Sequence, residues 1–117
     1  MKLGGFTMYK IDSGKLTVYA SAGESPKNRL QSVRTAAEKM AKQLNLNFEM
    51  VKRTGAAQIY VYYETGNEDP IPLYCDEGKT GDFTEISSKI RNMMFVLSFH
   101  PKHSGLKQVR QSLFTLS

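Results

Sequence analysis

Cysteine is almost absent from the chain, and long apolar runs are missing altogether. The one cysteine, Cys75, cannot form an internal disulfide, and the six methionines are prone to oxidation, so a reducing compartment fits the composition. No run approaches the roughly 18 apolar residues of a membrane-spanning helix, and the start of the chain lacks the apolar segment of a signal peptide. We therefore expect a cytoplasmic protein with no membrane partner.

Familiar catalytic and cofactor-binding motifs are also missing. The chain has no dinucleotide-binding fingerprint and no Gly-x-Ser-x-Gly nucleophile elbow. Gly78-Lys79-Thr80 looks like the end of a phosphate-binding P-loop, but that loop needs a glycine five residues earlier, where Leu73 stands. A solvated turn before a helix is therefore the better interpretation of this segment.

Histidine is nearly as scarce as cysteine. His100 and His103 stand three apart around Pro101, and Cys75 is the one thiol that could join them, whereas a zinc site needs four ligands or three plus water. His100 fits the end of a helix better, because a cation there favours the helix dipole and Pro101 stops the helix. A Cys75–histidine nucleophilic pair is disfavoured, because the carboxylates that follow Cys75 raise a thiol pKa. We predict no catalytic residue, metal or cofactor, and favour a protein that is not an enzyme.

The remaining composition is that of an ordinary globular protein. Hydrophobic residues make up 40% of the 117 residues and charged residues 23%, without repeats, linkers or low-complexity runs. These features predict a single domain over residues 1–117. The formal net charge of +5 allows weak attraction to nucleic acid or anionic surfaces but does not indicate it.

Alternating apolar and polar residues predict a sheet of about five strands. The clearest strand is 58–64, where β-branched and aromatic residues alternate between breakers. We expect one hairpin at the start of the chain and a second across the turn at 54–56, and Pro70 and Pro72 put the last strand at an edge. The expected strands are 6–11, 16–20, 48–53, 57–64 and 71–75.

Two or three helices should cover one face of this sheet. Ser25-Pro26 predicts the start of a helix that ends near Asn45, and Asp82 with Glu85 predicts the start of a second, with Phe83, Ile86, Ile90, Met93 and Leu97 on its apolar side. Residues 93–99 are apolar on all sides, so they form either a helix sandwiched beneath the last segment or a buried strand; we favour the helix. Ser104 could cap a last helix. The order ββ-α-βββ-αα predicts an α+β fold with two layers and a mostly antiparallel sheet.

Tyrosine gives the sequence its one specific hint of function. If the apolar residues of the strands face the helices, five of the six tyrosines share the opposite face of the sheet. Such a patch is typical of protein interfaces, but it is equally consistent with cross-strand ladder packing that stabilises an exposed sheet. The five residues are Tyr9, Tyr19, Tyr60, Tyr62 and Tyr74.

Two hypotheses of function follow from this pattern. The first is a small binding module that uses the tyrosines for contact with a protein partner or with itself, as a homo-oligomer. The second is nucleic-acid binding, in which basic helix faces contact phosphates. We favour the first, because few cations could reach the tyrosines. The candidate phosphate contacts are Lys39, Lys42, Lys107 and Arg110.

Overall fold

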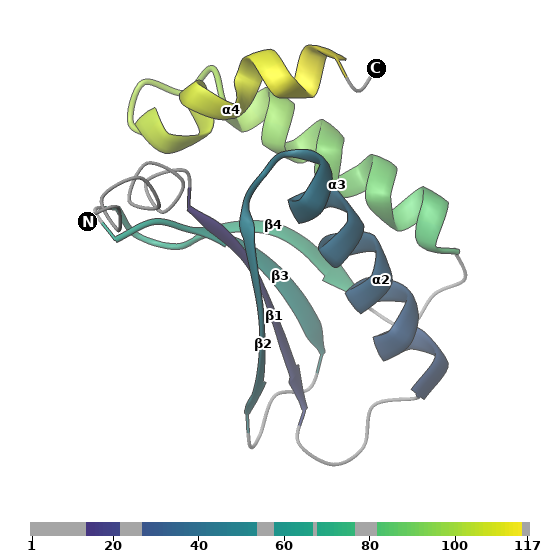
Figure 1. The fold of residues 1–117 in the computed structure, drawn as a ribbon. Helices are drawn as coiled ribbons and strands as arrows, with labels where there is room; N and C mark the ends of the chain where they lie inside the picture. Colours follow the sequence, from purple (N-terminus) through teal and green to yellow (C-terminus); the bar gives the residue numbers. More distant parts are fainter. Residues whose placement is uncertain (1–13, 22–26, 54–57, 67, 77–81, 116–117) are drawn as a thin grey trace, which may run out of the picture.

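The computed structural model confirms an α+β fold, with a four-stranded mixed sheet and three helices among the residues that it describes (Figure 1). It describes residues 14–21, 27–53, 58–66, 68–76 and 82–115. The strands are β1 (Lys15–Ser21), β2 (Asn47–Arg53), β3 (Ile59–Glu64) and β4 (Ile71–Asp76). The helices are α2 (Lys27–Gln43), α3 (Phe83–Leu97) and α4 (Ser104–Thr115). In Figure 1, α2 and α3 lie along one side of the sheet and α4 crosses its upper end.

The order of the strands is β2-β1-β3-β4. β1 is parallel to β2 and antiparallel to β3, which is in turn antiparallel to β4. The predicted hairpin between residues 48–53 and 57–64 is therefore wrong, because β1 lies between these strands. Helix α2 carries the chain back so that β2 starts beside the beginning of β1, as a parallel pair requires. The predicted strand 6–11 lies outside the described residues.

Helix α2 ends where the sequence predicts. Asn45 has a φ of 59°, the left-handed conformation that asparagine tolerates better than most residues. The backbone N–H of Leu46 donates to Ala41 at 2.8 Å and that of Asn45 donates to Lys42 at 3.2 Å, the two hydrogen bonds of a Schellman motif. This turn directs the chain straight into β2.

Helix α3 starts with the predicted cap, because Asp82 Oδ1 accepts a hydrogen bond from the backbone N–H of Glu85 at 3.0 Å. It runs to Leu97, so the choice between helix and strand for this segment is settled as helix. Phe83 and Met93, two residues of the predicted apolar side, are partly exposed, with exposed fractions of 40% and 43%. The side chains of α3 that are fully covered are Ile86, Ile90 and Met94.

The core lies between the sheet and the helices. β1 and β3 contribute fully buried side chains from alternate positions, and α4 adds Leu106, Val109 and Leu113 above α3. One edge of this core holds a buried ion pair between Arg29 of α2 and Asp76 of β4. The helical layer is thus tied to one face of the sheet, and the described helices leave the other face open (Figure 1).

Candidate functional site

Strand β3 divides its side chains cleanly between the two faces of the sheet. Ile59, Val61 and Tyr63 are buried beneath the helices, with exposed fractions of 3%, 0% and 1%. Tyr60 and Tyr62 alternate with them and are half-buried on the open face. The register places Tyr62 opposite Thr17 and Tyr60 opposite Tyr19. The central strands therefore present three neighbouring tyrosines on one surface, which we call the tyrosine face.

The aromatic rings of this face contact one another in a chain. The rings of Tyr19 and Tyr62 meet edge to face, with centroids 5.4 Å apart and planes at 85°. The ring of Tyr60 is 6.3 Å from that of Tyr62 and tilted by 51°. At the other end, the guanidinium of Arg53 in β2 lies 4.2 Å from the centroid of Tyr19, a cation–π contact. These contacts run across β2, β1 and β3.

A carboxylate holds this chain of rings in place. Glu64 accepts a hydrogen bond from the hydroxyl of Tyr19 at 2.5 Å and another from that of Thr17 at 2.6 Å. Burial, then the hydrogen bond to Glu64, raises the pKa of Tyr19 to about 12. Thr17 is fully buried although it lies on the open face. The tyrosine face is therefore a packed polar layer rather than a row of loose rings.

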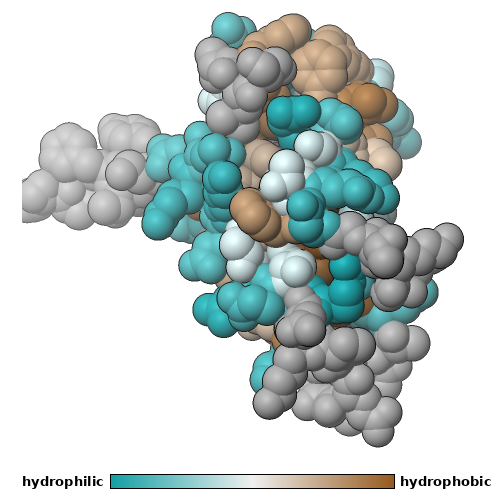
Figure 2. All heavy atoms as spheres, turned by 90° about the vertical axis from the view of Figure 1, so that its right-hand side faces the viewer, coloured by the Kyte–Doolittle hydropathy of each residue, from teal (hydrophilic) through white to brown (hydrophobic). Residues whose placement is uncertain are grey.

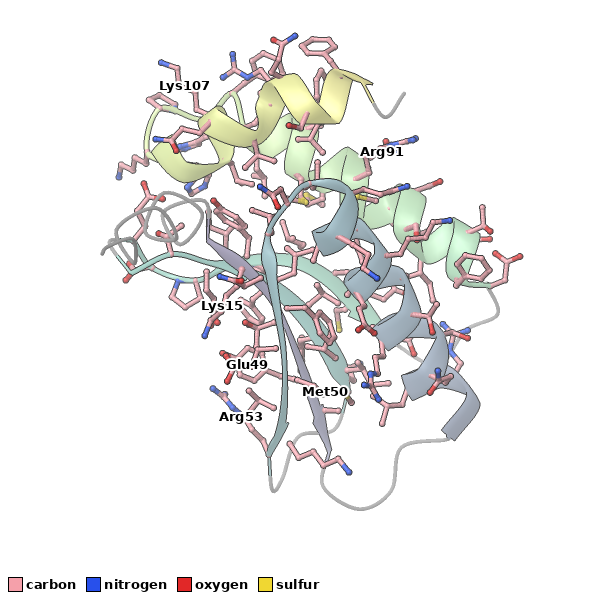
Figure 3. The ribbon with its side chains drawn as sticks, viewed as in Figure 1. Lys15, Glu49, Met50, Arg53, Arg91 and Lys107 are labelled. Carbon is pink, nitrogen blue, oxygen red and sulfur yellow. The ribbon has the colours of Figure 1, made fainter. Side chains whose placement is uncertain are left out.

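Charges on the tyrosine face balance. Lys15 pairs with Glu49, and this contact raises the pKa of Lys15. Figure 3 shows Lys15, Glu49 and Arg53 on the side of the sheet away from the helices, with Met50 on the other side. With Glu64, the described residues of this face carry two cations and two carboxylates, so its net charge is zero. The whole chain, in contrast, carries +5.

Tyr74 does not belong to this face, so its predicted position is wrong. The pairing of β3 with β4 shifts between Val61 and Tyr62, and Tyr74 pairs with the buried Val61. Tyr74 therefore packs on the core side, where its hydroxyl donates to Asp76 at 2.9 Å. Burial, then the hydrogen bond to Asp76, raises the pKa of Tyr74 to about 12. The fifth predicted residue, Tyr9, lies outside the described residues.

The four predicted phosphate contacts do not form one site. Lys39 and Lys42 are exposed on α2, and Lys107 is exposed on α4. Both helices pack on α3, which separates them. Arg110 is engaged within the molecule: it donates to the carbonyl oxygen of Ser98 at 2.7 Å, and its guanidinium lies 4.1 Å from the Phe99 ring.

Sequence reasoning missed an apolar cluster where α4 crosses α3. Phe95 contacts Phe99 and Phe114 edge to face, each at 5.1 Å. Phe99 and Phe114 are 54% and 52% exposed, and Val96 is 64% exposed. Figure 2 shows apolar side chains gathered at this end of the molecule. The sequence signal for this cluster was that residues 93–99 are apolar on all sides. A single covering helix cannot shield every side of α3, so some of these side chains stay exposed.

The thiol and the two imidazoles each have a contact in the structure. Cys75 is exposed, and its thiol donates to Gln58 at 3.2 Å. The rings of His100 and His103 lie 4.7 Å apart in the loop after α3. In the part of the chain that the structure describes, no three His, Cys, Asp or Glu residues are placed to hold a metal. None of the described helices is long and apolar enough to cross a membrane. Gly78-Lys79-Thr80 lies outside the described residues.

Comparisons with family models, with curated proteins and with solved structures gave no match.

Proposed function

We propose that the protein is a non-enzymatic binding module whose tyrosine face makes contact with a second copy of the chain or with a protein partner. The observation that carries this proposal is the chain of half-buried rings, Tyr60, Tyr62 and Tyr19, on the sheet face that the described helices leave open. Tyrosine supplies contact area at low conformational cost and offers a hydroxyl as a polar handle. Packing these rings before binding lowers the cost of ordering them on contact.

The balanced charge of the face favours a copy of the same chain as one partner. A two-fold contact brings the same surface together twice, so a face of one sign would repel itself. Lys15 and Arg53 are offset here by Glu49 and Glu64, which lets each sign meet its opposite across the axis. The same carboxylates argue against nucleic acid at this face, because they lie beside the rings on which bases would stack.

Light scattering over a range of protein concentrations tests self-association. We expect the mass to rise from monomer toward dimer with concentration in the unchanged protein. Tyr62→Arg should shift the midpoint to a higher concentration by at least about tenfold, since it places a charge at the centre of the contact. A urea midpoint measured in parallel checks that the variant is folded.

Phe114→Arg is the matched control, because it adds the same charge to the apolar cluster of α3 and α4 and leaves the sheet untouched. It should leave association unchanged. If Phe114→Arg abolishes association and Tyr62→Arg does not, the contact belongs to the helices and the proposal is wrong. If the unchanged protein stays monomeric at the highest soluble concentration, self-association is excluded.

Nucleic-acid binding is the second candidate function, and one feature favours it. From residue 86 onward the chain has no Asp or Glu but carries Lys89, Arg91, Lys102, Lys107 and Arg110. Exposed cations such as Lys102 and Lys107 attract phosphate chains in a salt-dependent way. Salt-dependent retention on heparin or duplex DNA tests this function. Lys107→Glu should weaken retention, whereas Lys15→Glu, on the tyrosine face, should change it less.

A further inference from the structure

A small polar pocket lies between α2 and α3, away from the tyrosine face. Its volume is about 190 Å³, below the roughly 300–1,000 Å³ of sites for drug-sized ligands. The pocket therefore fits one chemical group rather than a whole large ligand. Its polar lining residues are Lys39, Gln43, Thr84, Ser87, Ser88 and Arg91.

Positive charge in this pocket has no counter-charge within the described residues. Lys39 and Arg91 both line it, and neither forms an ion pair there. Figure 3 shows Arg91 on α3. The ammonium of Lys39 lies 5.5 Å from the centroid of Phe83, another lining residue, so the cation is held at the pocket wall.

The carboxylates of the same two helices are occupied elsewhere. Glu38 of α2 pairs with Arg34 along the helix, and Glu85 of α3 pairs with Lys89. No carboxylate lines the pocket. Lys39 and Arg91 thus line a space that no carboxylate of the described residues lines.

A buried hydroxyl points to the same conclusion. The Oγ atom of Ser87 is shielded from solvent and has no hydrogen-bond partner in the described residues. An unsatisfied buried hydroxyl costs free energy, and a ligand atom that accepts a hydrogen bond from it would remove this cost. Ser88 and Thr84 add two further hydroxyls from neighbouring turns of α3.

We propose that this pocket binds the terminal phosphate group of a phosphomonoester or free orthophosphate. Such a group carries a charge of about −1.5 to −2 at pH 7, which matches the two cations, and its three or more oxygens accept hydrogen bonds from the hydroxyls and the amide. A phosphodiester carries a single negative charge and is a poorer match. The pocket is separate from the tyrosine face, so phosphate binding can be tested independently of the contact proposed above.

Titration with methyl phosphate, followed by backbone amide NMR at constant ionic strength, tests the site. We expect saturable shifts confined to residues 39–43 and 84–91. Arg91→Gln and Lys39→Gln should each weaken binding at least about tenfold, because each removes a charged partner of the phosphate. Orthophosphate, titrated in parallel, shows by its relative affinity whether the free anion or the ester is the better ligand.

Matched variants distinguish phosphate binding in this pocket from general electrostatic attraction to a basic protein. Lys42→Gln and Lys89→Gln remove one positive charge from the same helices outside the lining and should leave the affinity within about twofold. Ser87→Ala should weaken binding by a few fold while leaving the urea midpoint unchanged or raised. Equal losses for lining and non-lining variants, or equal affinity for dimethyl phosphate, would overturn the proposal.

Discussion

The two faces of the sheet hold the same three chemical groups in different surroundings. On the covered face, the hydroxyl of Tyr74 donates to Asp76, which also pairs with Arg29. On the open face, the hydroxyl of Tyr19 donates to Glu64, and Arg53 stacks on the tyrosine ring. Each cluster thus combines a tyrosine, a carboxylate and an arginine.

The difference lies in where the arginine binds. In the covered cluster the guanidinium meets the carboxylate directly, donating from Nε at 3.1 Å as well as from Nη2, and the exposed side-chain fractions are 17% for Arg29 and 4% for Asp76. In the open cluster it lies over the ring, at the exposed end of β2. The covered cluster joins α2 to β4 and stabilises the fold. The open cluster joins side chains of β1, β2 and β3 at the surface of the sheet.

Breaking the covered cluster should have the largest effect. Asp76→Asn removes the counter-charge of Arg29 in a buried position, and losing one partner of such a pair costs about 3–5 kcal/mol. We expect a loss of this size in the free energy of unfolding, measured by urea denaturation. Adding Arg29→Met to Asp76→Asn should recover part of the loss, because the unpaired charge is then gone. A loss no larger than that of the matching change on the open face, Glu64→Gln, would contradict the difference drawn between the clusters.

High pH should weaken both clusters together with the core. The pKa of Tyr19, Tyr63 and Tyr74 is raised to about 12 from an ordinary value of 10.0, for Tyr63 first by burial and then by the negative charge of Glu68. Because the unfolded chain loses these protons first, the stabilising contribution is complete below pH 10 and is lost as the pH rises through 12. For the buried Tyr63 this contribution is roughly 2–3 kcal/mol.

Urea denaturation at several pH values between 10 and 12 measures this loss. Tyr63→Phe should flatten the decline most, and Tyr74→Phe and Tyr19→Phe should flatten it less, because those tyrosines are only half-buried. A stability that stays constant over this range, or a decline that no Tyr→Phe variant changes, would show that the phenols are not protected by the fold.

Sequence periodicity was enough to predict the fold class, the helices and the position of three tyrosines on the open face. Period-two alternation in 58–64 separates Tyr60 and Tyr62 from Tyr63 whatever the neighbouring strands are. It was not enough to place Tyr74. Val61 pairs with Tyr74 and Tyr62 pairs with Pro72, so Leu73 is passed over and the alternation of faces along β4 is interrupted there. Pro72 stands beside the shift, but a proline fits an edge strand as well as a bulge, so the sequence does not single out this irregularity.

The rest of the site depends on which strands and helices are neighbours. The hydrogen bonds of Glu64 come from β1, 45 and 47 residues earlier in the chain, and exist because β1 takes the place beside β3. The pocket of Lys39 and Arg91 likewise requires α2 to pack on α3. Both are consequences of tertiary packing, which local pattern does not encode.

Glu64→Gln should cost about 1 kcal/mol, much less than Asp76→Asn. The amide keeps one acceptor oxygen but replaces the other with a donor, so one of the hydrogen bonds from Thr17 and Tyr19 is lost. The pKa of Tyr19 should fall toward 10, measured by ultraviolet difference absorbance. Glu49→Gln is the matched control on the same face: its partner Lys15 is exposed, so the change should stay within about 0.5 kcal/mol. An unchanged Tyr19 pKa would show that Glu64 does not hold this hydroxyl.

Arg53→Gln should have the smallest effect on stability and a diagnostic effect on Tyr19. An exposed cation–π contact is worth about 0.5–1 kcal/mol, so the loss should be at the limit of measurement by urea denaturation. The positive charge of Arg53 lowers the pKa of Tyr19, and its removal should therefore raise that pKa, opposite in direction to Glu64→Gln. Lys52→Gln removes the same charge from the neighbouring residue, whose partner in β1 is the buried Ala20, and should leave the Tyr19 pKa unchanged. Opposite shifts from Arg53→Gln and Glu64→Gln require both charges to lie against one phenol, which makes the pair a direct test of the open cluster in solution.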